Sequence, residues 1–321
     1  MHKENSAPGA VSLGSLIHTD KQRLIENCPE YISTGFKEFD KNLGGGLTPN
    51  LFVLGAASSV GKSTFILQIA HNIANQGYPV LFFSLEMPAQ ILAEKGMLCQ
   101  LYIKYGDKIP HDLFTCRQTM ERFLANKQDK AVLYKAISEF EKSAADIYVI
   151  DRTESGKIFS FSDIERYTAD FKKKHSKTPV IIVDYLQLLH RDEKYGMTDK
   201  QIVDRNISDL WSLSHRMKTP VIVISSINRT SYNTPMRNSA FKESGSIEFS
   251  ADILLGLQIQ KNQNTKGENA DRLLELIILK NRFGASQCRI PMKFHARYGF
   301  FEEIKSRNPA DREGKRDEER I

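Results

Sequence analysis

The chain has 321 residues and a formal net charge of +6, and it is 40% hydrophobic and 26% charged. These values are typical of a globular protein with one large α/β domain or two small ones. No apolar run reaches membrane-spanning length, and the polar start MHKENSAPGA is unlike a signal peptide, so we expect a cytoplasmic protein without membrane contact.

Charge and cysteine content limit the classes of site. The positive charge permits a polyanionic partner but does not establish one, because many basic proteins bind none. The cysteines lie far apart and lack the spacing of a zinc site or a disulfide framework, at Cys28, Cys99, Cys116 and Cys288. We therefore expect reduced, structural thiols.

The two ends of the chain are polar. Residues 1–30 contain prolines, glycines and a short helical pattern near Leu16–Ile25, and we expect an N-terminal arm or linker there. Such an arm could pack on a neighbouring subunit or lead to a partner domain, and a frayed terminus is an equal alternative. Residues 306–321 are nearly all polar or charged, which predicts a disordered tail.

Between the ends, over residues 31–305, short apolar runs alternate with helical patterns, as in buried parallel strands joined by helices. In chain order we expect a strand at Leu51–Gly55, a helix at Lys62–Gln76, a strand at Pro79–Leu85, helices within Ala89–Phe140, a strand at Asp146–Ile150, a helix at Phe161–His175, a strand at Val180–Asp184, a helix at Lys200–Met217 and a strand at Val221–Ser225. This alternation predicts an α/β fold, with a mainly parallel sheet covered by helices on both faces.

The pattern changes after Ala251. Four apolar runs separated by short turns predict antiparallel strands at the C-terminal end of the sheet, at Asp252–Gln258, Leu273–Lys280, Arg289–Phe294 and Gly299–Ile304. We therefore expect residues 31–305 to form one domain.

The stretch LFVLGAASSVGKSTF, Leu51–Phe65, combines an apolar strand, a loop of small residues and a Gly-Lys-Ser sequence that opens a helix. Backbone N–H groups of such a loop can surround a phosphate, Lys62 can reach the outer phosphates, and the Ser63 hydroxyl can ligate Mg²⁺. Ala56 stands where the strict pattern has glycine, and Gly55 lies one place early. We expect a nucleotide-binding loop formed by Ala57, Ser58, Ser59, Val60, Gly61, Lys62, Ser63 and Thr64.

Two acidic residues follow buried strands and are candidates for the chemistry. Asp184 closes one strand, where a second magnesium-holding carboxylate is expected, although it could instead cap the next helix. Glu86 closes another strand and is the candidate base that activates water for attack on the γ-phosphate. The alternative for Glu86 is a surface glutamate at the start of a helix.

Polar groups also end the strand that follows the Asp184 strand. Ser226 or Asn228 could sense the γ-phosphate, and Arg229 could contact a phosphate or nucleic acid, with simple loop solvation as the alternative.

Further on, Lys280 and Arg282 stand at a tight turn at the sheet edge. From there they could reach a neighbouring subunit's nucleotide and stabilise charge on the transferring phosphoryl group, although an ordinary basic hairpin turn is also possible.

Two loops mix cations with glycine and small polar residues, His190–Gln201 and Thr230–Ser246. Such loops can follow the phosphates of a single nucleic-acid strand, but charged solvated loops are also common. The candidate nucleic-acid residues are Arg191, Lys194, Lys200, Arg229, Arg237 and Lys242.

The segments STGFKEFDKNLGGGL, GAASSVGKST, FFSLEM, VIIVDYLQLL, SSINR, FKESGSIEFSADILLGLQ and LKNRFG resemble, in order, the ATPase domain of DnaB-type replicative helicases, and most of all the helicase halves of phage and mobile-element primase–helicases. The resemblance covers about Ser33 to Gly284. It implies a RecA-like P-loop ATPase fold, a homohexameric ring, ATP and Mg²⁺ as cofactors, hydrolysis at subunit interfaces, and unwinding of duplex DNA by translocation on single-stranded DNA.

The same resemblance assigns roles residue by residue. Lys62 and Ser63 match the phosphate and magnesium residues, Glu86 the catalytic glutamate, and Asp184 the second magnesium residue. Lys280 and Arg282 match the pair that acts across the interface, with Arg282 as arginine finger. The loops after Leu189 and after Arg229 match the DNA-facing loops, and a primase or helicase loader is an implied partner.

The chain departs from the family pattern in three respects, one of which is Lys95, where arginine is frequent. Ser226 stands where many members have glutamine, and the N-terminal collar domain of full-length members does not precede the ATPase segments. A RecA-like ATP-binding regulator or loader that assembles with a partner without unwinding DNA is therefore the alternative function.

Overall fold

The computed structural model describes residues 12–15, 31–106, 116–125, 127–151, 159–190, 196–232, 234–241, 244–260 and 271–304. Most of the predicted arm over 1–30, including the helical pattern near Leu16–Ile25, lies outside the described residues. So does the predicted tail over 306–321. Among the helices of the described ranges, none is both long and apolar enough to span a lipid bilayer.

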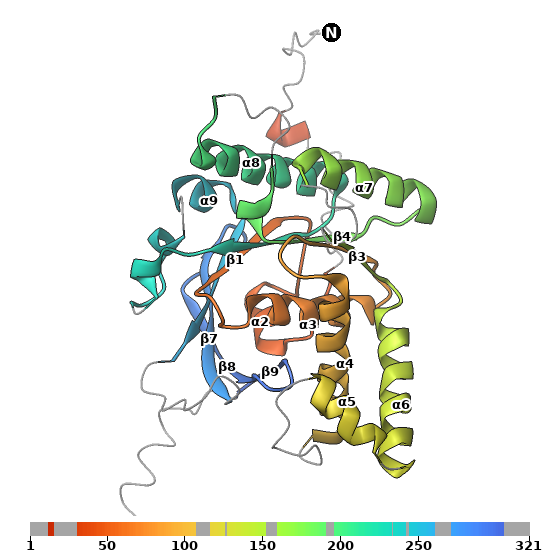
Figure 1. Ribbon diagram of the computed structural model, residues 1–321. Coiled ribbons are helices and arrows are strands. Elements are labelled where there is room, and N and C mark those ends of the chain that lie inside the picture. The colour runs from red at the N-terminus through yellow and green to blue at the C-terminus, as the bar shows by residue number, and fades with distance from the viewer. Residues whose placement is uncertain are drawn as a thin grey trace, which may run out of the picture.

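One sheet organises the described ranges, with nine strands in the order β3-β2-β4-β5-β1-β6-β7-β8-β9 (Figure 1). The strands are β1 Leu51–Ala56, β2 Val80–Ser84, β3 Ile147–Asp151, β4 Val180–Asp184, β5 Val221–Ser226, β6 Ile253–Ile259, β7 Arg272–Asn281, β8 Cys288–His295 and β9 Phe300–Glu303. Pairing is parallel from β3 to β6 and antiparallel from β6 to β9. The predicted fold class is confirmed, including the antiparallel end.

Helices cover both faces of this sheet (Figure 1). They are α2 Lys37–Asn42, α3 Lys62–Ala74, α4 Ala89–Tyr105, α5 Cys116–Leu124, α6 Lys127–Ala144, α7 Phe161–His175, α8 Asp199–Met217 and α9 Ser244–Ser250. The view shows α7, α8 and α9 above the sheet and α2, α3 and α4 below it. Sequence analysis missed α2 and α9, because helices of six or seven residues are too short to show a repeated apolar pattern.

The central strand β1 explains why a continuous apolar run forms a strand here. All six of its residues are buried. Successive side chains point to opposite faces of the sheet. Phe52 and Leu54 therefore join the core between the sheet and α3, whereas Leu51 and Val53 join the core between the sheet and the helices α7 and α8. A strand between two helical layers needs apolar residues at every position, which is the pattern that predicted it.

The antiparallel edge of the sheet is tied to α3 by one side chain. The Gln68 amide donates to the carbonyl oxygen of Phe301 at 2.9 Å, and its oxygen accepts from the Phe301 N–H at 2.8 Å. The Glu303 carboxylate accepts from the backbone N–H groups of Glu38 and Phe39, at the start of α2. These contacts fix β9 against α2 and against α3, the helix that follows the loop after β1.

A buried histidine lies where α3 meets the helical extension formed by α4, α5 and α6. His71 is 5% exposed, its ring lies 5.2 Å from that of Phe140, and Nδ1 has no hydrogen-bond partner among the described residues. Burial lowers the pKa of His71 to about 4 from an ordinary value of 6.5. The folded protein therefore holds this ring neutral at pH values where the unfolded chain protonates it.

This difference makes stability depend on pH. We expect the free energy of unfolding to fall as the pH drops from 6.5 to about 4, by roughly 3 kcal/mol at most, because only the unfolded chain gains the proton in that range. Urea unfolding curves at a series of pH values measure the slope, and His71→Leu should flatten it over this window. An unchanged slope in the variant would assign the pH dependence to other groups.

Candidate nucleotide-binding site

The loop between β1 and α3 has backbone geometry that glycine makes possible. Gly61, directly before α3, has φ of +104°, and a Cβ there would lie 2.9 Å from the Phe294 ring. A side chain at this position would therefore be strained and crowded. The free N–H groups and the positive end of the helix dipole both lie at the N-terminal end of α3. Together they favour a bound phosphate there.

The early glycine of the sequence pattern has a different explanation. A Cβ on Gly55 would lie 2.4 Å from the Phe241 ring and 3.0 Å from Ile227, whereas the neighbouring Ala56 is buried in the core. Gly55 thus lets Phe241 pack against β1. The glycine thus stands at position 55 because Phe241 packs against β1 there. The loop that follows Ala56 is not changed by this packing.

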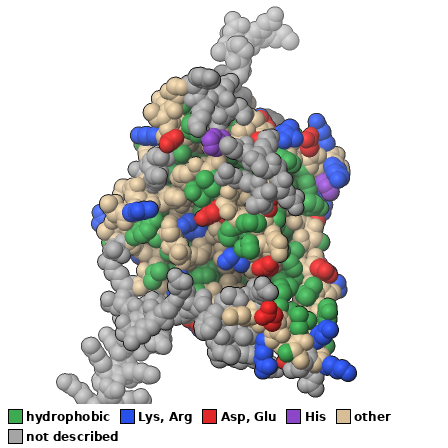
Figure 2. Space-filling view, viewed as in Figure 1, with side chains coloured by type: hydrophobic (Ala, Val, Ile, Leu, Met, Phe, Trp, Pro, Cys, Tyr) green, Lys and Arg blue, Asp and Glu red, His purple; other side chains and the backbone are tan. Residues whose placement is uncertain are grey.

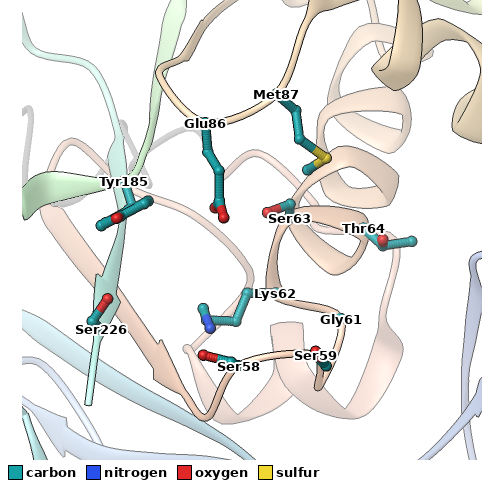
Figure 3. A pocket seen from close by; sticks show the side chains of 10 residues that line it. All are labelled: Ser58, Ser59, Gly61, Lys62, Ser63, Thr64, Glu86, Met87, Tyr185 and Ser226. Carbon is teal, nitrogen blue, oxygen red and sulfur yellow. The ribbon is translucent and has the colours of Figure 1, made fainter. Parts of the chain in front are cut away.

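A cavity of about 330 Å³ opens beside this loop (Figure 3). A volume of this size is within the usual range of ligand pockets. Its lining comes from the loop and from the ends of three strands: Ser58, Ser59, Gly61, Lys62, Ser63, Thr64, Glu86, Met87, Tyr185 and Ser226. The structure therefore brings together six of the eight predicted loop residues, the predicted base and one predicted sensor residue.

Lys62 lies at the base of the cavity. Its Nζ donates to the carbonyl oxygens of Ala56 at 3.1 Å and Ala57 at 2.9 Å. Burial lowers the pKa of Lys62, whereas the nearby Asp184 and Glu86 carboxylates act in the opposite direction. A partly desolvated ammonium next to the loop is positioned for the outer phosphates of a nucleotide.

Asp184 is 1% exposed, and neither carboxylate oxygen makes a hydrogen bond of ordinary geometry within the described ranges. Burial raises the pKa of Asp184 to about 6, Glu86 adds to this effect, and the nearby Ser63 hydroxyl and Lys62 oppose it. The following turn, η2 (Leu186–Leu188), has no side-chain cap, so Asp184 does not have the capping role considered above. A buried carboxylate close to a serine hydroxyl fits a site for a hard cation such as Mg²⁺.

Glu86 follows β2 and its exposed side chain extends into the cavity toward Ser63 and Lys62 (Figure 3). The next helix, α4, is preceded by Pro88 as its N-cap residue, and the Asp151 carboxylate accepts a hydrogen bond from the N–H of its first residue, Ala89. Glu86 therefore does not cap α4, and its carboxylate is free to accept a proton from water in the cavity.

The segment after β5 separates the two predicted sensor residues. Ser226 lines the cavity, and its N–H donates to the Gln187 amide oxygen at 3.2 Å, while Gln187 also donates to the Ser225 hydroxyl. Asn228 is not among the lining residues, because its amide donates to the carbonyl oxygen of Phe241 and its N–H to that of Ala240. Asn228 thus closes the following loop.

Several residues near the cavity were missed by sequence analysis. Met87 and Tyr185 line it, and each follows a predicted strand end, which is the signal that could have indicated them. The Tyr232 hydroxyl lies 3.3 Å from that of Ser58, and no sequence pattern marks that contact. Two predicted loop residues, Ala57 and Val60, instead line a small neighbouring cavity.

Lys280 and Arg282 do not line the cavity of their own chain. The Lys280 ammonium donates to the carbonyl oxygens of Glu248 at 2.5 Å and Ala251 at 2.7 Å, at the C-terminal end of α9. Arg282 donates to the carbonyl oxygen of Phe249 at 2.5 Å and lies 3.6 Å from the buried Asp252 carboxylate. Both cations are held at the C-terminal end of β7, with the Arg282 side chain 42% exposed.

The predicted nucleic-acid residues are only partly described. Lys200 in the first turn of α8, Arg229 at the start of η3 (Arg229–Ser231) and Arg237 before η4 (Asn238–Ala240) are exposed. Arg191, Lys194 and Lys242 lie outside the described residues. On the face in Figure 2, basic and acidic side chains are interspersed, so charge alone does not mark a nucleic-acid surface there.

Comparison with known proteins identifies the family. Residues 31–303 match the DnaB-like helicase C terminal domain. The chain belongs to this family. Replicative DNA helicase DnaB of Geobacillus stearothermophilus is 35% identical over 258 residues, which are 79% of this chain and 52% of the relative. Replicative DNA helicase DnaC of Bacillus subtilis is 33% identical over 258 residues, with the same shares. The chain thus spans about half the length of the curated relatives it matches.

Solved structures share this fold. A DnaB-like replicative helicase described with its interactions with primase superposes with a TM-score of 0.73 at 23% identity, covering 92% of this chain and 67% of that chain. A separately solved ATPase domain gives a TM-score of 0.74 at 23% identity, covering 92% of this chain and 99% of that chain. The RecA-like fold implied by the resemblance is confirmed.

Proposed function

We propose that this chain is the ATPase domain of a DnaB-type replicative DNA helicase, with residues 31–305 as the domain. In this proposal it hydrolyses ATP between the subunits of a homohexamer, moves along single-stranded DNA and unwinds the duplex. The observation that supports it most is that Lys62, Ser63 and Glu86 line one cavity, with the buried carboxylate of Asp184 close to all three.

The residues at and beside the cavity have different roles in ATP hydrolysis. Loop N–H groups and the Lys62 ammonium bind the phosphates of ATP, and the Ser63 hydroxyl and the Asp184 carboxylate hold Mg²⁺. The bound ion supplies positive charge to the phosphates. Glu86 accepts a proton from the attacking water, for which its exposed position beside Lys62 is suitable. Ser226 lies at the cavity wall, where it contacts the γ-phosphate.

Subunit contacts complete the site. Lys280 and Arg282 do not line their own cavity, and they reach the nucleotide of a neighbouring subunit, where Arg282 stabilises charge on the transferring phosphoryl group. Lys200, Arg229 and Arg237, with Arg191, Lys194 and Lys242, contact single-stranded DNA. A primase or a helicase loader is a further partner, and the cytoplasm is the place of action.

The ATPase rate per subunit, measured against protein concentration with and without oligo(dT), tests this function. We expect the rate to rise steeply with concentration, because each site needs a residue from a second copy, and to rise again with DNA. A rate that depends on neither would contradict the helicase proposal and favour the ATP-binding regulator or loader.

A further inference from the structure

The short helix α9 contacts Lys280 and Arg282, the two cations that act on a neighbouring subunit's nucleotide in the proposed function. Its last carbonyl groups have no partners within the helix and carry the negative end of the helix dipole. Lys280 donates to the carbonyl oxygens of Glu248, Phe249 and Ala251, and Arg282 donates to that of Phe249. The positions of both side chains therefore depend on where α9 lies.

The other contacts of α9 lead to the loop predicted to face DNA. The Glu248 carboxylate accepts a hydrogen bond from the Asn238 amide at 2.9 Å. Asn238 begins η4 and directly follows Arg237, a predicted DNA residue. On the opposite side, the Ser246 hydroxyl donates to the Asp204 carboxylate of α8. Glu248 is thus the residue that contacts the loop with its side chain and Lys280 with its carbonyl oxygen.

The surface around these cations is suited to contact with another protein surface. Phe249 is 78% exposed and Phe283, next to Arg282, is 65% exposed. Exposed aromatic side chains beside a functional cation are typical of an interaction surface. If another protein surface packs on Phe249 and Phe283, a displacement of α9 would change the positions of Lys280 and Arg282 relative to that surface.

We infer that α9 is a positioning element for Lys280 and Arg282, and that Glu248 links it to the loop 234–241, so that a strand bound to the loop sets the cations for hydrolysis in the neighbouring subunit. The inference rests on the proposed function and adds to it the path by which DNA raises the hydrolysis rate. It assigns positioning roles to Glu248 and Asn238, neither of which touches the nucleotide cavity.

The test uses the full chain and the ratio of ATPase rates with and without oligo(dT). Glu248→Ala should lower this ratio at least about fivefold, the lower end of typical coupling between sites. Glu248→Gln should restore most of it, because an amide oxygen can still accept from Asn238. Asn238→Ala should also lower the ratio, and the double variant should be no worse than Glu248→Ala alone, since both remove one link.

Glu275→Ala serves as the matched control, because Glu275 is an acidic residue of β7 that pairs with Arg289 on the same sheet. Its ratio should equal that of the wild type. Thermal melting of each variant separates loss of folding from loss of coupling. An unchanged ratio in a folded Glu248→Ala protein, or additive losses in the double variant, would overturn the inference.

Failure of the underlying function gives a different result. If wild-type protein shows no DNA stimulation, or Arg282→Ala hydrolyses ATP normally, then the proposed function and this inference both fail. If the wild type is stimulated and Arg282→Ala is inactive while Glu248→Ala behaves as wild type, only the inference fails.

Discussion

Arg282→Ala should reduce ATP hydrolysis by about a thousandfold or more while leaving ATP binding nearly intact. The reason is that Arg282 is absent from its own chain's cavity and lies exposed at the C-terminal end of β7, so its loss affects only the charge supplied to a neighbour. Steady-state ATPase assays measure the first quantity, and equilibrium titration with a fluorescent ATP analogue measures the second.

Mixing experiments show whether Arg282 acts between subunits. Arg282→Ala and Lys62→Ala proteins should each be inactive alone, and a mixture should regain some activity, because composite interfaces pair an intact Lys62 with an intact Arg282. Loss of ATP binding in the arginine variant, or no recovery in the mixture, would indicate a role within one chain.

Two controls show whether the effect of Arg282→Ala comes from lost stability or from the loss of any positive charge. Asp252 keeps its hydrogen bonds from the Leu51 N–H at 3.0 Å and the Trp211 indole at 3.1 Å when Arg282 is removed. We therefore expect little change in melting temperature. Arg289→Ala is the matched control, since Arg289 is an arginine of similar exposure on β8 and should leave hydrolysis unchanged.

Glu86→Gln is expected to have the second large effect, a loss of about 10²- to 10⁴-fold in hydrolysis rate, which is the usual contribution of a general base. The amide has the same shape but cannot accept the proton from water. ATP affinity should stay close to that of the wild type, so that single-turnover experiments find ATP bound and intact.

A neutral substitution elsewhere distinguishes the role of Glu86 from a general change in surface charge. Glu165→Gln removes one carboxylate from α7, where Glu165 lies 2.7 Å from Arg216, and it should hydrolyse ATP normally. A Glu86→Gln protein with more than about a tenth of wild-type activity would assign proton acceptance to another group.

The parts of the fold that sequence analysis predicted are those where local chemistry and tertiary position agree. The apolar runs that became β1, β4 and β5 are buried on both faces, so their composition could belong only to central strands. Lys62, Ser63, Glu86 and Asp184 were predicted to act on one nucleotide, because the loop and both acidic residues follow buried strands. In the structure Lys62, Ser63 and Glu86 line one cavity and Asp184 lies close to them, and their chemical roles stay predictions.

Other features depended on packing between distant segments. Gly55 was taken for a displaced loop glycine, and only the position of Phe241 shows why it stands there. Asn228 was grouped with Ser226 because the two are close in sequence, yet the turn after β5 directs Asn228 to Phe241 and away from the cavity. The helix α9 was not predicted, and its first three residues were included in the loop Thr230–Ser246, because seven residues of mixed polarity carry no helical periodicity.

The contact between Gln68 and β9 has a consequence for solubility. A strand at the edge of a sheet exposes unpaired N–H and C=O groups, and these can recruit a strand from another molecule. At Phe301 the Gln68 amide occupies both groups, so it takes the place that an added strand would need. The chain thereby closes part of its sheet edge to uncontrolled aggregation, using a residue from the helix α3.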